Sequence, residues 1–128
     1  MRIIGGNLKG KNILGPIDKS TRPLKDMVKE SIFNIIEHSE NEFVNLNNAN
    51  VLDLFSGTGS FGIECLSRGA KKVNFFENYI NSIKVLKKNL DLLKLNKNSK
   101  IIEKDIYNIS YSQLNLKKFD LIFLDPPF

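Results

Sequence analysis

The chain has 128 residues, of which 41% are hydrophobic, so it can form one small domain with a modest core. Its formal net charge at pH 7 is +5. The first 29 residues hold seven basic and two acidic side chains, which accounts for the whole excess. Such a basic arm indicates a polyanionic partner, although an ordinary solvated surface would have the same composition.

Single residues limit the chemistry that the chain can carry. Cys65 is the only cysteine and His38 the only histidine, which leaves no intrachain disulfide and no ligand cluster at the spacing of a metal site. No uninterrupted apolar run is longer than five residues, so the sequence predicts no signal peptide and no membrane span. We therefore expect a cytoplasmic protein without a metal ion.

The first 50 residues are expected to form a basic hairpin and a helix. Residues 2–14 alternate apolar positions with glycines, which favours a short hairpin with exposed lysines. The Ser-Thr-Arg-Pro stretch from Ser20 indicates the start of a helix that runs to about His38. Residues 39–50 are polar and rich in asparagine, which is typical of a surface connection. The apolar face expected of the helix consists of Leu24, Val28, Ile32, Ile35 and Ile36.

From residue 51 onward strands and helices alternate, which predicts an α/β fold with a parallel sheet and right-handed crossovers. Gly69 is expected to end the first of these helices in the left-handed conformation. Residues 108–118 are expected to form a polar loop. The predicted strands are 51–55, 72–77, 101–104 and 119–125, and the predicted helices are 60–67 and 80–95.

A glycine-rich turn follows the first predicted strand. Gly57, Gly59 and Gly62 match G-x-G-x-x-G, which brings bare backbone against a nucleotide-like cofactor in many folds. Glu77 follows the second strand, where a carboxylate can accept both ribose hydroxyls, but a dinucleotide dehydrogenase would share this feature. Asp53 helps to distinguish a dinucleotide cofactor from a cofactor that carries positive charge. An acid inside the first strand suits a cofactor with an ammonium and a sulfonium better than a pyrophosphate, unless nearby backbone amides satisfy it.

Two further motifs follow the third and fourth strands. Asp105 could accept a hydrogen bond from an adenine amino group, or it could cap the next segment. The stretch Asp125 to Phe128, DPPF, offers a carboxylate, the Pro126 carbonyl and an aromatic ring to a planar amine. Two acceptors on the amine hydrogens favour a pyramidal nitrogen, and Phe128 would stack on the base. This pattern is that of an amino-methyltransferase using S-adenosylmethionine, and a simple proline-proline strand end is the alternative.

The sequence contains four informative stretches, RIIGGNLKGKNI, TRPLKDMVKESIFNII, VLDLFSGTGSFGIECLSRGA and LDPPF. Together they resemble the bacterial 16S ribosomal RNA guanine-N2 methyltransferase family known as RsmD, over essentially the whole chain. The resemblance implies a Rossmann-like methyltransferase fold with strand order 3-2-1-4 and S-adenosyl-L-methionine as cofactor. It implies N2 of one guanine in 16S ribosomal RNA, free or in the assembling small subunit, as acceptor, and a monomer when the fold is complete.

The resemblance also implies roles for individual residues. Cofactor contacts fall on Asp53, Phe55, Gly57, Gly59, Glu77 and Asp105. Catalytic handling of the target base falls on Asp125, Pro126 and Phe128. Salt-dependent contacts with RNA phosphates fall on Arg2, Lys9, Lys11 and Arg22. Placement of the N-terminal helix over the cofactor falls on Pro23, Asp26 and Glu30.

Family members continue beyond DPPF with further helices and three more strands. Residues 51–128 are therefore expected to be a methyltransferase core that is incomplete after DPPF, flanked by residues 1–50. The chain alone is expected to be poorly soluble and nearly inactive, because its fourth strand would lie at an open edge. The alternatives are another amino-methyltransferase, acting on DNA or on protein glutamine, a nicotinamide-binding domain, and a non-catalytic RNA-binding fragment. Asp125 argues against the glutamine enzymes, which typically have asparagine there.

Overall fold

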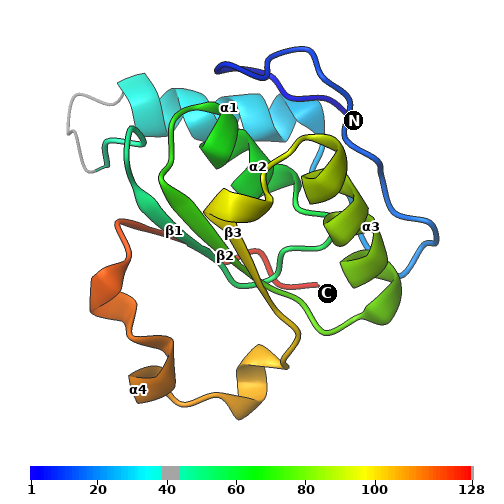
Figure 1. Ribbon diagram of the computed structural model, residues 1–128, viewed down its shortest axis with the longest axis vertical. Helices are drawn as coiled ribbons and strands as arrows, with labels where there is room; N and C mark the ends of the chain where they lie inside the picture. The colour runs from blue at the N-terminus through cyan, green and yellow to red at the C-terminus, as the bar shows by residue number, and fades with distance from the viewer. Residues whose placement is uncertain (39–43, 128) are drawn as a thin grey trace.

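The computed structural model describes residues 1–38 and 44–127 as an α/β fold built on a four-stranded parallel sheet (Figure 1). The strand order β3-β2-β1-β4 confirms the expected fold class and order. Every strand pair is parallel, so the carboxyl ends of all strands lie at the same edge of the sheet. The strands are β1 (Asn50–Asp53), β2 (Lys72–Phe76), β3 (Ser99–Ile102) and β4 (Leu121–Phe123).

Helices connect these strands and cover the sheet. The region from 108 to 118, expected to be a polar loop, contains short helical turns, because Ser110 and Gln113 form a capping box there. Within residues 1–38 and 44–127, no helix is long and apolar enough to cross a membrane. The helices are α1 (Asp26–His38), α2 (Ser60–Ser67), α3 (Ile80–Leu92) and α4 (Tyr111–Leu114), with 3-10 segments η1 (Asn96–Asn98), η2 (Ile106–Asn108) and η3 (Leu116–Lys118).

Helix α2 lies between the sheet and α1, and all of its residues are buried. The Phe61 ring of α2 stacks on Phe33 of α1 with a centroid distance of 5.0 Å, and on Phe123 of β4 with a centroid distance of 3.7 Å. Gly62 permits this close packing, since a Cβ there would lie 2.3 Å from Cε1 of Phe75. The third glycine of the motif therefore brings α2 onto the sheet.

Helix α1 begins later than the sequence predicted, and its inward face matches the expected one only in part. Of the expected apolar residues, Leu24, Ile32 and Ile36 pack against the core. Val28 and Ile35, expected to be buried, are 46% and 69% exposed. Lys29 and Phe33 are the fully buried residues of this helix. The apolar periodicity was therefore a wrong guide at these positions, because a charged side chain with buried partners occupies the inner face.

Other element boundaries differ by a few residues from those predicted. The hairpin expected over 2–14 is present, but its strand pairing is a single antiparallel bridge between Arg2 and Asn12. Gly69 adopts the expected left-handed conformation, with a φ of 105°. Helix α3 and strand β4 are shorter than predicted, and β3 begins earlier. Of the connection expected over 39–50, residues 39–43 lie outside the described residues.

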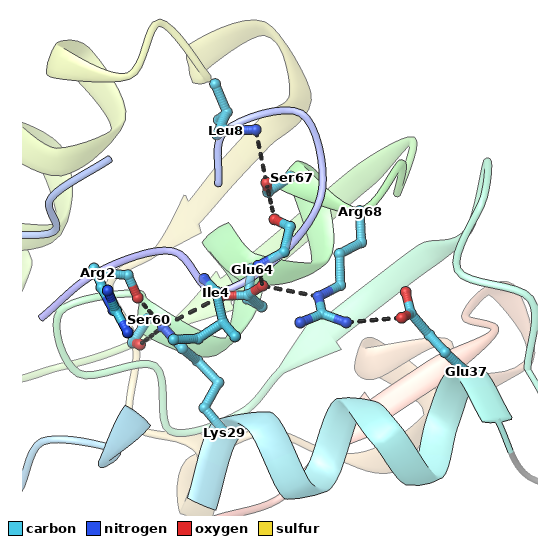
Figure 2. A network of polar contacts seen from close by, with 10 residues as sticks. Arg2, Ile4, Leu8, Lys29, Glu37, Ser60, Glu64, Ser67 and Arg68 are labelled. Atoms are coloured by element: carbon cyan, nitrogen blue, oxygen red, sulfur yellow. Dashed lines mark hydrogen bonds and ion pairs between the residues drawn. The ribbon is translucent and has the colours of Figure 1, made fainter. Parts of the chain in front are cut away.

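A buried ion pair fixes the N-terminal arm to the core (Figure 2). Lys29 and Glu64 are both fully buried, and Lys29 Nζ lies 3.3 Å from Glu64 Oε1. Lys29 Nζ also donates to the carbonyl oxygen of Arg2 at 2.7 Å and to Ser60 Oγ at 3.1 Å. Burial lowers the pKa of Lys29, and the Glu64 carboxylate offsets part of that effect.

The remaining lone pairs of Glu64 are also used. Its carboxylate accepts hydrogen bonds from the Ile4 N–H at 2.9 Å and the Gly5 N–H at 2.8 Å. Arg68 Nε donates to Glu64 Oε2 at 2.8 Å, and Arg68 Nη1 pairs with Glu37 at 2.7 Å. Residues on both sides of position 50 thus share one polar network, and a hydrophobic cluster also spans them. The division at residue 50 stays a prediction about roles.

Candidate active site

A cleft of about 330 Å³ lies at the carboxyl ends of the strands. Residues after all four strands line it, together with residues 20–24 that precede α1. Four of its lining residues are acidic, and among the described ones only Arg22 and Lys104 are basic. The cleft is therefore acidic in a protein with an overall positive charge. The acidic residues are Asp53, Glu77, Asp105 and Asp125.

The structure brings most of the predicted cofactor residues together in this cleft. Phe55 and Gly57 line it beside the four acids, whereas Gly59 does not. Gly59 has a φ of 94°, and a Cβ there would lie 2.4 Å from Cδ1 of Leu86. This glycine is needed for a left-handed turn and for close packing on α3. Gly57, with a φ of 56°, is the glycine of the turn that faces the cleft.

Glu77 holds the turns after β1 and β2. Its Oε1 accepts the Gly57 N–H at 2.7 Å. Its Oε2 accepts the N–H groups of Asn78 at 3.1 Å and Tyr79 at 3.0 Å. The sequence indicated a ribose acceptor at this position but gave no sign of these backbone bonds. The carboxylate lines the cleft in a direction that the protein backbone fixes.

Asp53 at the end of β1 is 1% exposed, and neither of its carboxylate oxygens has a hydrogen-bond partner. Burial raises its pKa to about 7, and the charges of Glu77 and Asp125 act in the same direction. The amides of Phe55 and Gly62 lower the pKa but make no hydrogen bond of ordinary geometry with the carboxylate. Backbone amides therefore do not satisfy this acid, and it lines the cleft with unused acceptor capacity.

Asp105 and its neighbours form the side of the cleft after β3. The Asp105 side chain accepts the Tyr107 N–H at 3.0 Å and thereby caps η2. This is the capping role that the sequence left open. The rings of Phe55 and Tyr107 lie 5.9 Å apart, tilted at 52°, and both line the cleft. The two rings present aromatic surface beside the Asp105 carboxylate.

Asp125 follows β4, which is hydrogen-bonded to β1, so it lies at the same sheet edge as Asp53. Its Oδ1 pairs with Arg22 Nη2 at 3.0 Å. The sequence assigned Arg22 to RNA phosphates and did not predict this contact across 103 positions. Pro127 lines the cleft, whereas Pro126 does not, and Phe128 lies outside the described residues.

The other predicted RNA-binding residues do not line the cleft. The turn of the N-terminal hairpin lies over the carboxyl end of α2, where the Leu8 N–H donates to Ser67 Oγ at 3.0 Å. Lys9 follows in this turn, and Lys11 lies on the returning arm. The cleft is at the opposite end of α2, about 12 Å away for a helix of this length. Arg2 faces Asp26 at 3.8 Å.

Sequence reasoning missed the contacts that hold residues 14–24 over the cleft. Asn89, fully buried on α3, donates to the carbonyl oxygens of Leu14 at 3.1 Å and Thr58 at 3.0 Å. The Thr21 hydroxyl forms a hydrogen bond with the Ser82 hydroxyl. Asp18 accepts from Tyr79 and Asn81, which lowers its pKa. The Thr21-Arg22-Pro23 stretch was the one sequence signal in this region, and it gave no information on these hydrogen-bond partners.

A parallel sheet in the order 3-2-1-4, a glycine turn after its first strand and carboxylates at the strand ends define a Rossmann-like methyltransferase fold. Residues 1–128 match the model of a protein family described as conserved hypothetical protein 95. The chain belongs to this family, that of the RsmD methyltransferases, which confirms the resemblance seen in the sequence.

Individual relatives agree with this membership. Ribosomal RNA small subunit methyltransferase D of Haemophilus influenzae is 36% identical over 100% of this chain and 64% of its own length. The protein of the same name from Escherichia coli is 31% identical over 100% of this chain and 60% of its own length. The solved structure of a provisionally named Escherichia coli methyltransferase, yhhF, has a TM-score of 0.78 and 31% identity, covering 100% of this chain and 64% of that one. The chain thus spans somewhat less than two thirds of the length of these relatives.

Proposed function

We propose that this protein methylates the exocyclic N2 amine of a guanine in 16S ribosomal RNA, with S-adenosylmethionine as methyl donor. The observation that best supports this proposal is that the Asp53 carboxylate is buried without a hydrogen-bond partner in the same cleft as Asp125. The two residues lie at the carboxyl ends of the hydrogen-bonded strands β1 and β4, at the same edge of the sheet. One carboxylate suits a cationic cofactor and the other suits an amine. The names of the relatives support a ribosomal RNA acceptor.

The residues of the first three strand ends fit the cofactor. Asp53 has two carboxylate oxygens without hydrogen-bond partners in a buried position, which suits an ammonium or sulfonium group. Burial disfavours the ionised carboxylate, and a bound cation would stabilise it. Glu77 presents a carboxylate for the ribose hydroxyls, and Phe55, Tyr107 and Asp105 surround the place proposed for the adenine. Bound S-adenosylmethionine supplies an electrophilic methyl group on a sulfonium centre.

The residues after β4 are proposed to act on the target base. The Asp125 carboxylate and the Pro126 carbonyl would accept the two hydrogens of the guanine amine and direct the nitrogen lone pair at the methyl group. Asp125 would also stabilise the positive charge that develops on the nitrogen. Phe128 is proposed to stack on the base, which requires the guanine to be flipped or unpaired.

The substrate and location belong to the same proposal. RNA of the small subunit would bring its phosphates to Arg22 at the cleft, while Arg2, Lys9 and Lys11 would meet more distant phosphates. Residues 1–50 would then serve the RNA and residues 51–128 the cofactor. An enzyme acting on the assembling ribosomal subunit would work in the cytoplasm.

The test is methyl transfer followed by identification of the product. The protein, extended by the segment that family members have beyond DPPF, is incubated with methyl-labelled S-adenosylmethionine and either in vitro transcribed 16S RNA or unmethylated small subunits. Digestion to nucleosides and mass spectrometry should yield N2-methylguanosine. N6-methyladenosine, N4-methylcytidine or 1-methylguanosine as the product would contradict the proposed acceptor. The Haemophilus influenzae relative, run in parallel, is the positive control for the substrates.

A further inference from the structure

The segment before α1 is held on both sides of the cleft. On the α3 side, Asp18 accepts the Tyr79 hydroxyl at 2.5 Å, and Thr21 bonds to Ser82. On the β4 side, Arg22 pairs with Asp125 at 3.0 Å. The backbone at Arg22 therefore has fixed neighbours, and the long guanidinium side chain can change partner without moving the segment.

The acidic lining of the cleft disfavours the approach of an RNA acceptor. The described cleft lining has four acids and two bases, so it attracts a cationic cofactor and repels a phosphate backbone. Arg22 is one of the two bases, and it pairs with Asp125. The same pair also occupies Oδ1 of the carboxylate that is proposed to accept the target amine.

We propose, on the basis of the proposed function, that Arg22 is a positioning residue that exchanges Asp125 for a phosphate of the entering RNA. Before RNA binds, the guanidinium holds the carboxylate in place at the cleft. When the acceptor enters, the guanidinium turns to a backbone phosphate and Oδ1 becomes available to the guanine amine. Acceptor entry is thereby coupled to the availability of the carboxylate.

The exposure of the pair makes this exchange feasible. The Arg22 and Asp125 side chains are 51% and 38% exposed, and exposed ion pairs contribute little net stability. A phosphate offers the planar guanidinium a bidentate partner, and its binding releases counterions from the RNA. The exchange therefore replaces the weak, exposed pair with Asp125 by a charge-assisted contact with a phosphate.

The test is a double-mutant cycle in RNA binding, with Asp125→Asn, Arg22→Gln and both together. The probe is unmethylated 16S RNA, measured by filter binding with saturating S-adenosylhomocysteine. If Asp125 competes with phosphate for Arg22, Asp125→Asn should tighten binding about fivefold, equivalent to ~1 kcal/mol for an exposed pair. In the Arg22→Gln background the same change should have an effect of about twofold or less. Arg22→Gln alone should reduce the slope of log K against log salt by about 0.7 to 1.

The control is Glu103→Gln, which breaks the exposed pair with Lys87 and should leave RNA binding unchanged in both backgrounds. Equal effects of Asp125→Asn with and without Arg22 would overturn the exchange, because they would reflect general charge repulsion only. An unchanged salt slope in Arg22→Gln would also overturn it. Absence of RNA binding by the wild type would overturn the proposed function itself, so the two failures are distinguishable.

Discussion

The Glu77 carboxylate after β2 accepts the Gly57 N–H of the turn after β1 at a distance of 2.7 Å. This single contact joins two strand ends of the cleft, and the other carboxylate oxygen accepts two further backbone N–H groups. The acid therefore shapes the cleft before it meets any ligand. A substitution at this position acts on both the turn and the proposed ribose contact.

We expect Glu77→Ala to weaken S-adenosylmethionine binding by about 1.5 to 3 kcal/mol, because charged hydrogen bonds and the fixed turn are lost together. Glu77→Gln should weaken it less, since the amide oxygen can still accept the Gly57 N–H. Titration calorimetry measures both. Glu103→Ala removes an exposed acid that follows β3 and serves as the control. Unchanged affinity in Glu77→Ala would contradict the assignment of the cofactor side.

Asp53 makes stability depend on pH in a defined direction. Its pKa of about 7 in the folded protein exceeds the ordinary value of 3.8, so the folded state binds an extra proton between these values. Stability from this group therefore rises as the pH falls through 7 and is lost above it. Asp53→Asn should stabilise the protein by up to about 4 kcal/mol at pH 8. Urea denaturation should show this advantage shrinking toward pH 4, and a constant difference would contradict the buried charge.

The same substitution should abolish cofactor binding. An ionised Asp53 is the counter-charge proposed for a cationic cofactor, and asparagine offers only a neutral amide. For the wild type, affinity should fall as the pH drops below about 7, because the carboxylate is then protonated in the free protein. Calorimetry in two buffers of different ionisation enthalpy should detect proton release on binding at pH 6 and little at pH 8.5. Tight binding by a stabilised Asp53→Asn variant would remove Asp53 from the site.

The sheet and the position of the carboxylates at its edge were predictable because their signals are local. Strand ends after β1 and β2 place Asp53 and Glu77 at one edge whatever the exact boundaries are. The inner face of α1 was predictable only in part. Lys29 is buried there because Glu64 and a carbonyl oxygen satisfy it, and these partners are remote in the sequence. Apolar periodicity assumes that charges face solvent, so it missed Lys29, although the predicted Ile32 and Ile36 do pack against the core.

At the end of β4, where the target base is proposed to bind, one residue was predictable from the sequence and its partner was not. The DPPF stretch identified Asp125 at a strand end, and the structure places it in the cleft. Its partner Arg22 lies in a segment without regular secondary structure, so the periodicity of the sequence could not predict where this side chain lies. Arg2, Lys9 and Lys11 were grouped with Arg22 by the family resemblance and by their charge. Charge identifies a polyanion-binding surface but not which cations converge on one cleft.

Asp125→Asn should lower kcat for methyl transfer by about 10²- to 10³-fold while leaving cofactor affinity within about twofold. The reason is that Asp125 is proposed to contact only the amine, whereas the cofactor is proposed to bind at the first three strand ends. Steady-state kinetics with 16S RNA and calorimetry with S-adenosylmethionine, both on the protein extended beyond DPPF as in its family, separate the two effects. Asp120→Asn is the matched control, because this aspartate lies at the opposite end of β4 and its oxygen can still accept the Asn50 N–H. Near-normal turnover of Asp125→Asn would contradict its catalytic role.

The buried pair of Lys29 and Glu64 should be far more important for stability than an exposed pair of the same chemistry. Lys29→Met removes one partner and leaves the buried Glu64 carboxylate with less compensation, which should cost at least ~3 kcal/mol of unfolding free energy. Lys87→Met breaks the pair with Glu103, whose side chains are 53% and 47% exposed, and should cost at most about 1 kcal/mol. Urea denaturation at pH 7 compares the two variants directly. Adding Glu64→Gln to Lys29→Met should recover part of the loss, because the buried carboxylate charge is then gone and Arg68 keeps its pair with Glu37. Equal losses for the two lysine variants would show that the network in Figure 2 does not hold the N-terminal arm on α2.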